Sequence, residues 1–169
     1  SEVWEEVLSC EPLDGYEETD HHDAAYAVYT SGTTGNPKGV LHEQGNVDIC
    51  VLSSYYDGKG MFSPGDRGIH VIPLNFVASI MVLPTLLYLG NVPIRIISFS
   101  TLKNPIALVK YLLVNRISII LITPTYAQKL AGKTGPFLKK VCVGSEPANH
   151  FHLKGLTNYN MYSQSESGF

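Results

Sequence analysis

Residues 117–122 read ISIILI, and this short run decides the fold class. Five of its six residues are large and apolar, without the alternation of apolar and polar positions that marks a half-exposed strand. A run of this kind is typical of a strand in a parallel sheet, because helices cover both faces of such a sheet. We therefore predict a strand at Ile117–Ile122 that is buried on both faces.

Helical and extended stretches alternate on either side of this run. Asn104 and Pro105 predict the start of a helix that reaches about Asn115, since asparagine caps helices and proline suits the first turn. Further helices are predicted at 46–56, 76–88 and 124–130, and further strands at 25–29, 40–41, 68–72, 92–97, 140–143 and 159–162. This alternation indicates βαβ units, and so an α/β fold with a doubly wound parallel sheet.

The composition describes one domain with few charges. Hydrophobic residues make up 44% of the 169 residues, and charged residues make up 16%. A disordered chain would be more polar, and a free-standing domain carries about 25% charged residues, so we expect one face to pack on something else. The acidic residues 1–23 are interpreted as a lead-in segment before one domain at 24–169.

Net charge and cysteine content indicate which binding partners and which cellular compartment to expect for the protein. A net charge of −3 gives no reason to expect a nucleic-acid partner. The three cysteines, Cys10, Cys50 and Cys142, are widely spaced and odd in number, which argues against a disulfide framework or a zinc site and favours a cytoplasmic setting. The most apolar stretch, 76–89, is shorter than a membrane span, so we expect no membrane partner.

Residues 29–40 form the most specialised segment, YTSGTTGNPKGV. Glycine lets a backbone bend close to a ligand, and the N–H groups of such a bend form an anion-binding nest. The segment places hydroxyl groups, glycines and one lysine together, at Thr30, Ser31, Gly32, Thr33, Thr34, Gly35 and Lys38. The hydroxyls would donate to phosphate oxygens and the ammonium would offset their charge. We interpret the segment as a phosphate-binding loop, although its Pro-Lys-Gly order differs from the usual nucleotide loop.

Residues 158–169 read NYNMYSQSESGF and offer groups that suit a nucleotide. Tyr162 is an aromatic plate that can stack on a base, and Asn160 can donate and accept at the edge of adenine. Ser165 and Glu166 supply hard oxygen atoms of the kind that magnesium prefers. Ligands of parallel sheets bind beyond the carboxyl ends of the strands. We therefore expect the segments that follow Tyr29, Ile122, Val143 and Tyr162 to lie along one edge.

Two of these segments carry a family resemblance. Residues 23–40, DAAYAVYTSGTTGNPKGV, resemble the phosphate-loop signature of adenylation domains of nonribosomal peptide synthetases, which belong to the adenylate-forming (AMP-binding) enzymes. Residues 160–166 resemble the family motif Asn-x-Tyr-Gly-x-Thr-Glu, with serine at 163 and 165 in place of glycine and threonine. The resemblance implies ATP and Mg²⁺ as cofactors, in a subdomain of such an enzyme's N-terminal domain.

The resemblance also assigns roles to single residues. It implies Tyr162 on adenine, Asn160 on the amino edge of adenine, Ser165 near the α-phosphate, and Glu166 on magnesium. Lys38 and its loop would hold the β- and γ-phosphates, so Lys38, Ser165 and Glu166 are the expected catalytic residues. The turn Gly144, Ser145 and Glu146 resembles a Gly-Gly-Glu or Gly-Ser-Ala turn of the family, whose backbone lines adenine.

Residues 74–79, LNFVAS, resemble the Phe-Asp-x-Ser segment whose aspartate pairs with the α-ammonium of an amino acid. Val77 stands at that position, and burying an ammonium without a counter-charge is costly. The positions that match the family's acid pocket are all apolar: Val77, Ala78, Met81, Leu121, Val141, Val143 and Met161. We expect a small hydrophobic acid without a free α-ammonium, such as a branched 2-keto acid. The alternative is that Val77 belongs to the ordinary core.

The implied reaction forms an acyl-adenylate and then a thioester on a phosphopantetheinyl carrier protein or on coenzyme A. The resemblance covers most of residues 24–169, and it implies that an N-terminal subdomain and a small C-terminal domain with a catalytic lysine lie outside this segment. The chain alone is expected to bind ATP weakly and to adenylate nothing at a useful rate. Two alternatives stay open, an acyl-CoA ligase fragment and a non-catalytic nucleotide-binding scaffold.

Overall fold

The computed structural model describes residues 2–11, 14–30, 36–56, 61–73, 76–89 and 92–162. The helices are α1 (Glu2–Ser9), α2 (Gln44–Tyr56), α3 (Val77–Leu89), α4 (Phe99–Lys103), α5 (Pro105–Val114) and α6 (Pro124–Gln128). The strands are β1 (Ala24–Thr30), β2 (Lys38–Glu43), β3 (Gly68–His70), β4 (Ile94–Ile96), β5 (Ile119–Ile122), β6 (Lys140–Val143) and β7 (Thr157–Asn160). No helix in these ranges is both long and apolar enough to cross a membrane.

Five strands form one parallel sheet in the order β4-β3-β5-β6-β7, with the apolar strand β5 at its centre. This sheet confirms the predicted α/β class. Strands β1 and β2 instead form a separate antiparallel hairpin, in which Thr30 pairs with Lys38. The expectation that β1 joins the parallel sheet is thus corrected. Residues 31–37 are too few for the crossover that parallel strands require.

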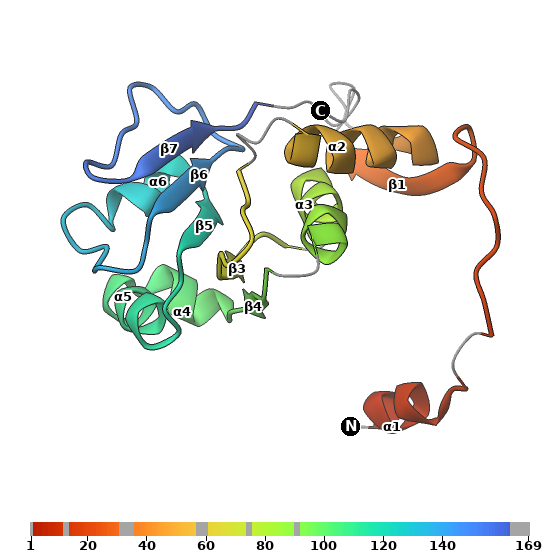
Figure 1. Ribbon diagram of the computed structural model, residues 1–169, viewed down its shortest axis with the longest axis horizontal. Helices are drawn as coiled ribbons and strands as arrows, with labels where there is room; N and C mark the ends of the chain where they lie inside the picture. The colour runs from red at the N-terminus through yellow and green to blue at the C-terminus, as the bar shows by residue number, and fades with distance from the viewer. Residues whose placement is uncertain are drawn as a thin grey trace.

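Helices cover both faces of the parallel sheet, and each face has its own core. On one face, α4, α5 and α6 pack against β5 and β6 through Leu102, Leu108, Leu112, Ile120, Ile122, Ala127, Val141 and Val143. On the other face, Val82 of α3 and Phe62, which precedes β3, pack against Ile119, Leu121 and Cys142. Figure 1 shows α3 on one side of the sheet, with α4 and α5 on the other. Successive strand residues alternate between the two cores because side chains alternate along a strand.

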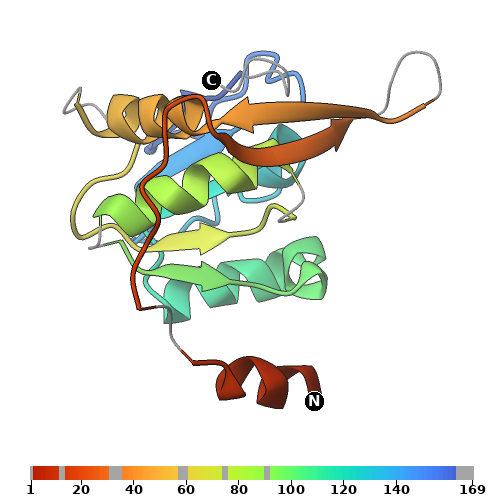
Figure 2. The ribbon, with the colours of Figure 1, turned by 90° about the vertical axis from the view of Figure 1, so that its right-hand side faces the viewer.

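The hairpin and α2 lie beside the parallel sheet, with α2 packed against α3. Figure 2 shows the carboxyl end of β1 directed to the same side of the molecule as the carboxyl ends of β3 and β4. Helix α1 lies apart from the other elements in both views (Figures 1 and 2). The end of β1 that leads into the predicted phosphate loop therefore faces the same way as the ligand-binding edge of a parallel sheet.

Local signals explain most of the helix starts. The side chain of Asn104 accepts hydrogen bonds from the backbone N–H groups of Ile106 and Ala107, at 3.1 and 3.2 Å, as predicted for a capped helix. Helix α4 was not predicted, because five residues are too few for a helical period to show. Strand β7 begins and ends two residues earlier than predicted, so Met161 and Tyr162 lie beyond it.

Candidate functional site

A cavity of about 210 Å³ lies at the carboxyl-terminal edge of the parallel sheet. Its wall comes from the segment after β3, from the start of α3 and from the ends of β5, β6 and β7: Ile72, Phe76, Val77, Ala78, Leu121, Ile122, Thr123, Gly144, Ser145 and Met161. Most of these side chains are apolar, and none of them is charged. The cavity therefore suits a small ligand with an apolar body.

The cavity brings together several residues that the sequence predicts for the acid pocket. Val77, Ala78, Leu121 and Met161 line it. Met81 lies on α3, but its side chain is outside the described part. The predicted roles of these residues as pocket residues stay predictions.

Val141 and Val143 lie elsewhere, in the core on the opposite face of the sheet, where they are 0% and 1% exposed. In the register of β5 and β6, Leu121 pairs with Cys142, so the residues before and after Cys142 point away from Leu121. The Cys142 side chain belongs to the same core as Leu121 and Met161. Burial raises the pKa of the Cys142 thiol to about 12, so this side chain is an uncharged packing group.

A buried serine fixes the start of α3 beside the cavity. The Ser79 hydroxyl lies 2.8 Å from the Pro73 carbonyl oxygen, 3.3 Å from that of Ile72, and 3.2 Å from His70 Nε2. Burial lowers the pKa of His70, although a hydrogen bond with the Ile72 backbone opposes this shift. His70 is therefore a neutral partner that joins the end of β3 to α3. The sequence analysis missed it, and its one signal was a histidine within an apolar strand.

The turn after β6 brings its backbone close to the end of β7. A Cβ atom at Gly144 would lie 3.1 Å from the Met161 carbonyl oxygen, so the close approach favours glycine. Ser145 follows with a φ of 66°, a left-handed conformation that costs a non-glycine residue about 1–2 kcal/mol. A residue held in such a conformation at a cavity wall points to a functional constraint on this turn.

Glu146 connects this turn to the one after β5. Its Oε2 atom accepts hydrogen bonds from the Thr125 hydroxyl at 2.6 Å and from the Thr125 N–H at 3.3 Å. The hydrogen bond from the Thr125 hydroxyl is the main cause that holds the pKa of this carboxyl below its ordinary value. The side chain thus braces the two turns that border the cavity, and Glu146 itself is not among the wall residues.

The predicted nucleotide-binding residues are only partly described. Thr30 and Lys38 pair at the end of the hairpin where β1 leads toward β2, and Lys38 is exposed there. Asn160 ends β7 opposite Val143, and the Tyr162 side chain beyond it is 81% exposed. The predicted residues outside the described part are Ser31, Gly32, Thr33, Thr34, Gly35, Ser165 and Glu166. The described residues contain no cluster of three His, Cys, Asp or Glu side chains that could hold a metal ion.

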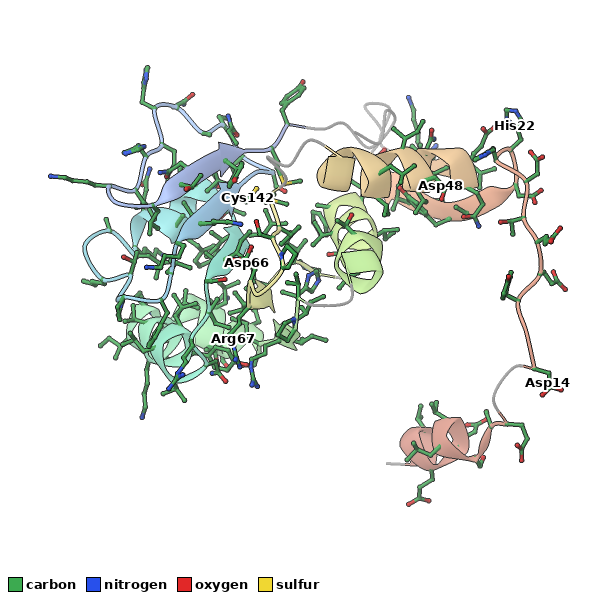
Figure 3. The ribbon with its side chains drawn as sticks, in the orientation of Figure 1. Asp14, His22, Asp48, Asp66, Arg67 and Cys142 are labelled. Carbon is green, nitrogen blue, oxygen red and sulfur yellow. The ribbon has the colours of Figure 1, made fainter. Side chains whose placement is uncertain are left out.

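The amino-terminal edge of the same sheet carries a different polar cluster. Lys140 Nζ lies 2.7 Å from Asp66 Oδ2, 2.8 Å from Ser63 Oγ and 3.2 Å from the Met61 carbonyl oxygen. The other carboxylate oxygen of Asp66 accepts a hydrogen bond of 2.7 Å from the Ser118 hydroxyl. Asp66 lies just before β3 (Figure 3), and its side chain is 10% exposed, against 17% for Lys140. The cluster ties β6 to the segments that enter β3 and β5.

The chain is similar to known proteins along nearly its whole length. The profile of the family described as AMP-binding enzyme matches residues 2–167. D-lysergyl-peptide-synthetase subunit 1 of Claviceps purpurea is 31% identical over 143 residues, which are 84% of this chain and 4% of that protein. Tyrocidine synthase 1 of Brevibacillus parabrevis is 34% identical over 130 residues, 73% of this chain and 12% of that protein. The chain thus spans a small part of these relatives.

Solved structures share the fold at lower sequence identity. The inhibitor-bound N-terminal domain of FACL13 from Mycobacterium tuberculosis is 20% identical with a TM-score of 0.78, over 98% of this chain and 43% of that one. O-succinylbenzoate coenzyme A synthetase from Bacillus subtilis, in complex with AMP, is 20% identical with a TM-score of 0.74, over 98% of this chain and 44% of that one. The fold of this chain is therefore shared with part of each of these two proteins.

Proposed function

The chain belongs to the AMP-binding enzyme family, and we propose that it is the ATP- and acid-binding part of an adenylate-forming ligase. In the proposed reaction, a carboxylate oxygen bonds to the α-phosphorus of ATP and pyrophosphate leaves, which gives an acyl-adenylate. The main support is the apolar cavity at the carboxyl-terminal edge of the parallel sheet, where such sheets bind ligands.

ATP would extend along this edge, away from the cavity. The exposed ring of Tyr162 and the glycine backbone at 144 fit a flat base, because a side chain at 144 would fill the gap beside Met161. Asn160 would bind the edge of adenine. The loop before Lys38 would donate hydrogen bonds to the phosphates, and the Lys38 ammonium would offset their charge. Ser165 and Glu166 carry the oxygens that we assign to the α-phosphate and to Mg²⁺. ATP, when bound, supplies the electrophilic phosphorus.

The acid is proposed to be hydrophobic and to lack a free α-ammonium. The cavity of about 210 Å³ has no charged side chain among its described wall residues, and Val77 stands where the family motif has aspartate. An ammonium in this wall would lose its water without gaining a counter-charge. A 2-keto acid with a branched aliphatic body meets both conditions.

ATP–pyrophosphate exchange by the complete protein tests the acid class. We expect 4-methyl-2-oxopentanoate to exceed leucine by at least about tenfold in kcat/KM, because the missing counter-charge disfavours the ammonium. Val77→Asp should reverse this order, while the matched control Val77→Leu, which stays apolar, should not. A wild-type preference for leucine would reject the acid class. Exchange with no acid in a folded protein would reject the adenylation itself.

The acceptor of the acyl group is proposed to be the phosphopantetheine thiol of a carrier protein. The relative at 31% identity is named as a subunit of a peptide synthetase, which supports this choice. Coenzyme A is the second candidate, since a coenzyme A synthetase shares the fold. Thioester formation measured with each acceptor in turn would separate them, and faster acylation of coenzyme A would reject the carrier protein.

The rest of the domain is proposed to complete the site. The chain matches 43% and 44% of the two solved chains, and so it lacks counterparts to the remainder of each. We therefore expect the isolated chain to bind ATP weakly, because it supplies only part of the contacts. Calorimetry of the isolated chain and of the complete protein with Mg·ATP would measure the difference, and equal affinities would contradict it.

A further inference from the structure

Thr123 has an unused polar atom at the cavity wall. It connects β5 to α6 and contributes to the wall beside Leu121 and Ile122. It occupies the N-cap position of α6, where a threonine hydroxyl usually accepts a hydrogen bond from a backbone N–H of the first turn. Here the side chain makes no such bond. Its Oγ1 atom is buried and has no hydrogen-bond partner within the described ranges.

A buried hydroxyl without a partner is unfavourable and calls for a physical reason. Two such side-chain atoms occur in the described part of the chain, Thr123 Oγ1 and Arg67 Nε. Arg67 lies at the amino end of β3, away from the cavity, whereas Thr123 borders it. A weak hydrogen-bonding contribution from the Thr123 hydroxyl also lowers the pKa of Glu146, so the hydroxyl lies near that carboxylate, but the two groups do not meet the geometry of a hydrogen bond. Glu146 already accepts both of its close hydrogen bonds from Thr125.

Resting on the function proposed above, we propose that Thr123 is a specificity-determining residue whose hydroxyl hydrogen-bonds a neutral oxygen beside the carboxylate of the acid. A rotation of about 120° about χ1 moves the hydroxyl of a threonine to a different staggered position and would present Oγ1 to the cavity. The apolar walls hold the aliphatic body, and Val77 sits on the same cavity. Thr123 would therefore distinguish a 2-keto acid from a saturated acid with the same carbon skeleton.

The cavity offers few competing polar side chains. Ser145 also borders it, but its side chain is exposed, so water already satisfies its hydroxyl. Thr125 is committed to Glu146. A site that hydrogen-bonds a substrate oxygen rejects the analogue without that oxygen much more strongly than an apolar wall distinguishes two shapes. Removal of the Thr123 hydroxyl should therefore lower kcat/KM for the keto acid and have little effect on kcat/KM for the saturated acid.

The test is ATP–pyrophosphate exchange by the complete protein with 4-methyl-2-oxopentanoate and with 4-methylpentanoate. We expect the wild type to prefer the keto acid by at least about tenfold in kcat/KM. Thr123→Val should bring the ratio close to one by lowering kcat/KM for the keto acid alone, and Thr123→Ser should restore most of it. Thr157→Val makes the same chemical change at an exposed position at the start of β7 and should keep the wild-type ratio.

Thermal unfolding supplies a second readout. Thr123→Val should unfold at the same temperature as the wild type or higher, because it replaces an unpaired buried hydroxyl with a methyl group. A threonine with a purely structural role would lower the unfolding temperature instead, and that result would overturn the proposal.

The kinetic outcomes separate the two proposals. Equal losses for both acids in Thr123→Val, an unchanged ratio, or a wild type without preference for the keto acid would overturn the role of Thr123 and leave the adenylation of a hydrophobic acid intact. Exchange with neither acid in a folded protein would reject the proposed function, and the role of Thr123 with it.

Discussion

The two edges of the five-stranded sheet use polar groups in opposite ways. At the amino-terminal edge, Lys140 and Asp66 are paired with each other and with neighbouring hydroxyl and carbonyl groups. At the carboxyl-terminal edge, the Thr123 hydroxyl lacks a partner and Ser145 holds a left-handed backbone. The Lys140–Asp66 cluster satisfies its polar groups internally and so stabilises the fold, although Arg67 Nε at the same edge is buried without a partner among the described residues. The carboxyl-terminal edge leaves polar groups and space for a ligand, which is typical of functional sites.

The largest expected effect breaks the amino-terminal edge. Lys140→Met leaves the nearly buried Asp66 carboxylate without its cation, and breaking a buried pair in this way costs about 3–5 kcal/mol. Urea unfolding measures the loss. The neighbouring exposed lysine gives the control, since Lys139→Met should change stability by less than about 0.5 kcal/mol. Equal losses of stability in both variants would contradict the role of the Lys140–Asp66 pair. An altered acid preference in Lys140→Met would show that the two edges are coupled.

A smaller effect is expected where the fold supports the cavity. Ser79→Ala removes the hydroxyl that joins α3 to Pro73 and His70, which should cost about 1–3 kcal/mol. Since Val77 lies in the same turn of α3, we also expect KM for the acid to rise. Ser100→Ala on the exposed α4 is the control and should change neither quantity. An unchanged KM in Ser79→Ala would contradict the claim that this serine supports the acid-binding wall.

The carboxyl-terminal edge can also be broken through its backbone. Gly144→Ala places a Cβ atom 3.1 Å from the Met161 carbonyl oxygen, and the displacement of backbone should cost about 1–2 kcal/mol. The shift would reach the wall of the cavity and the segment after β7 that we assign to the nucleotide. Pyrophosphate-exchange activity should therefore fall even at temperatures where the variant is fully folded. Gly15→Ala meets no atom within 4 Å and serves as the control. Wild-type exchange by Gly144→Ala would contradict the assignment of this turn.

The smallest effect concerns the brace between the two turns. Glu146→Gln weakens the hydrogen bonds from Thr125 and should cost less than about 1 kcal/mol at neutral pH, since the group is exposed. The ionised carboxyl is the favoured form, which is why its pKa is lowered. Its contribution is present above the unfolded pKa and is lost as pH falls through the lower folded pKa. Thermal unfolding of both proteins should therefore converge in acid, and a difference that grows in acid would contradict this sign.

The sequence predicted the sheet because its strongest signals are local. The apolar run at 117–122 and the cap at Asn104 act within a few residues, and both predictions are confirmed. The hairpin was missed although the short segment at 31–37 excludes a crossover helix. The short loop was the signal for a hairpin. The prediction instead followed the apolar character of β1, which resembles that of the strands in the parallel sheet.

The cavity was harder to predict because it depends on register. Val141 and Val143 differ from Cys142 by one position, and only the pairing of Leu121 with Cys142 decides which of them shares a face with Leu121. The partners of Ser79 and Glu146 come from other segments of the chain. Contacts of this kind are fixed by the packing of whole elements, and a single sequence carries no direct signal for them.

Hydrogen–deuterium exchange of the complete protein, with and without Mg·ATP and 4-methyl-2-oxopentanoate, tests most directly that ligands occupy the carboxyl-terminal edge. We expect slower exchange at the described segments that border the cavity and the nucleotide site, 71–73, 76–79, 123–125, 143–146 and 160–162. The amino-terminal edge, at 61–68 and 138–141, should stay unchanged. Protection confined to the amino-terminal edge, or protection nowhere while pyrophosphate exchange proceeds, would contradict the account.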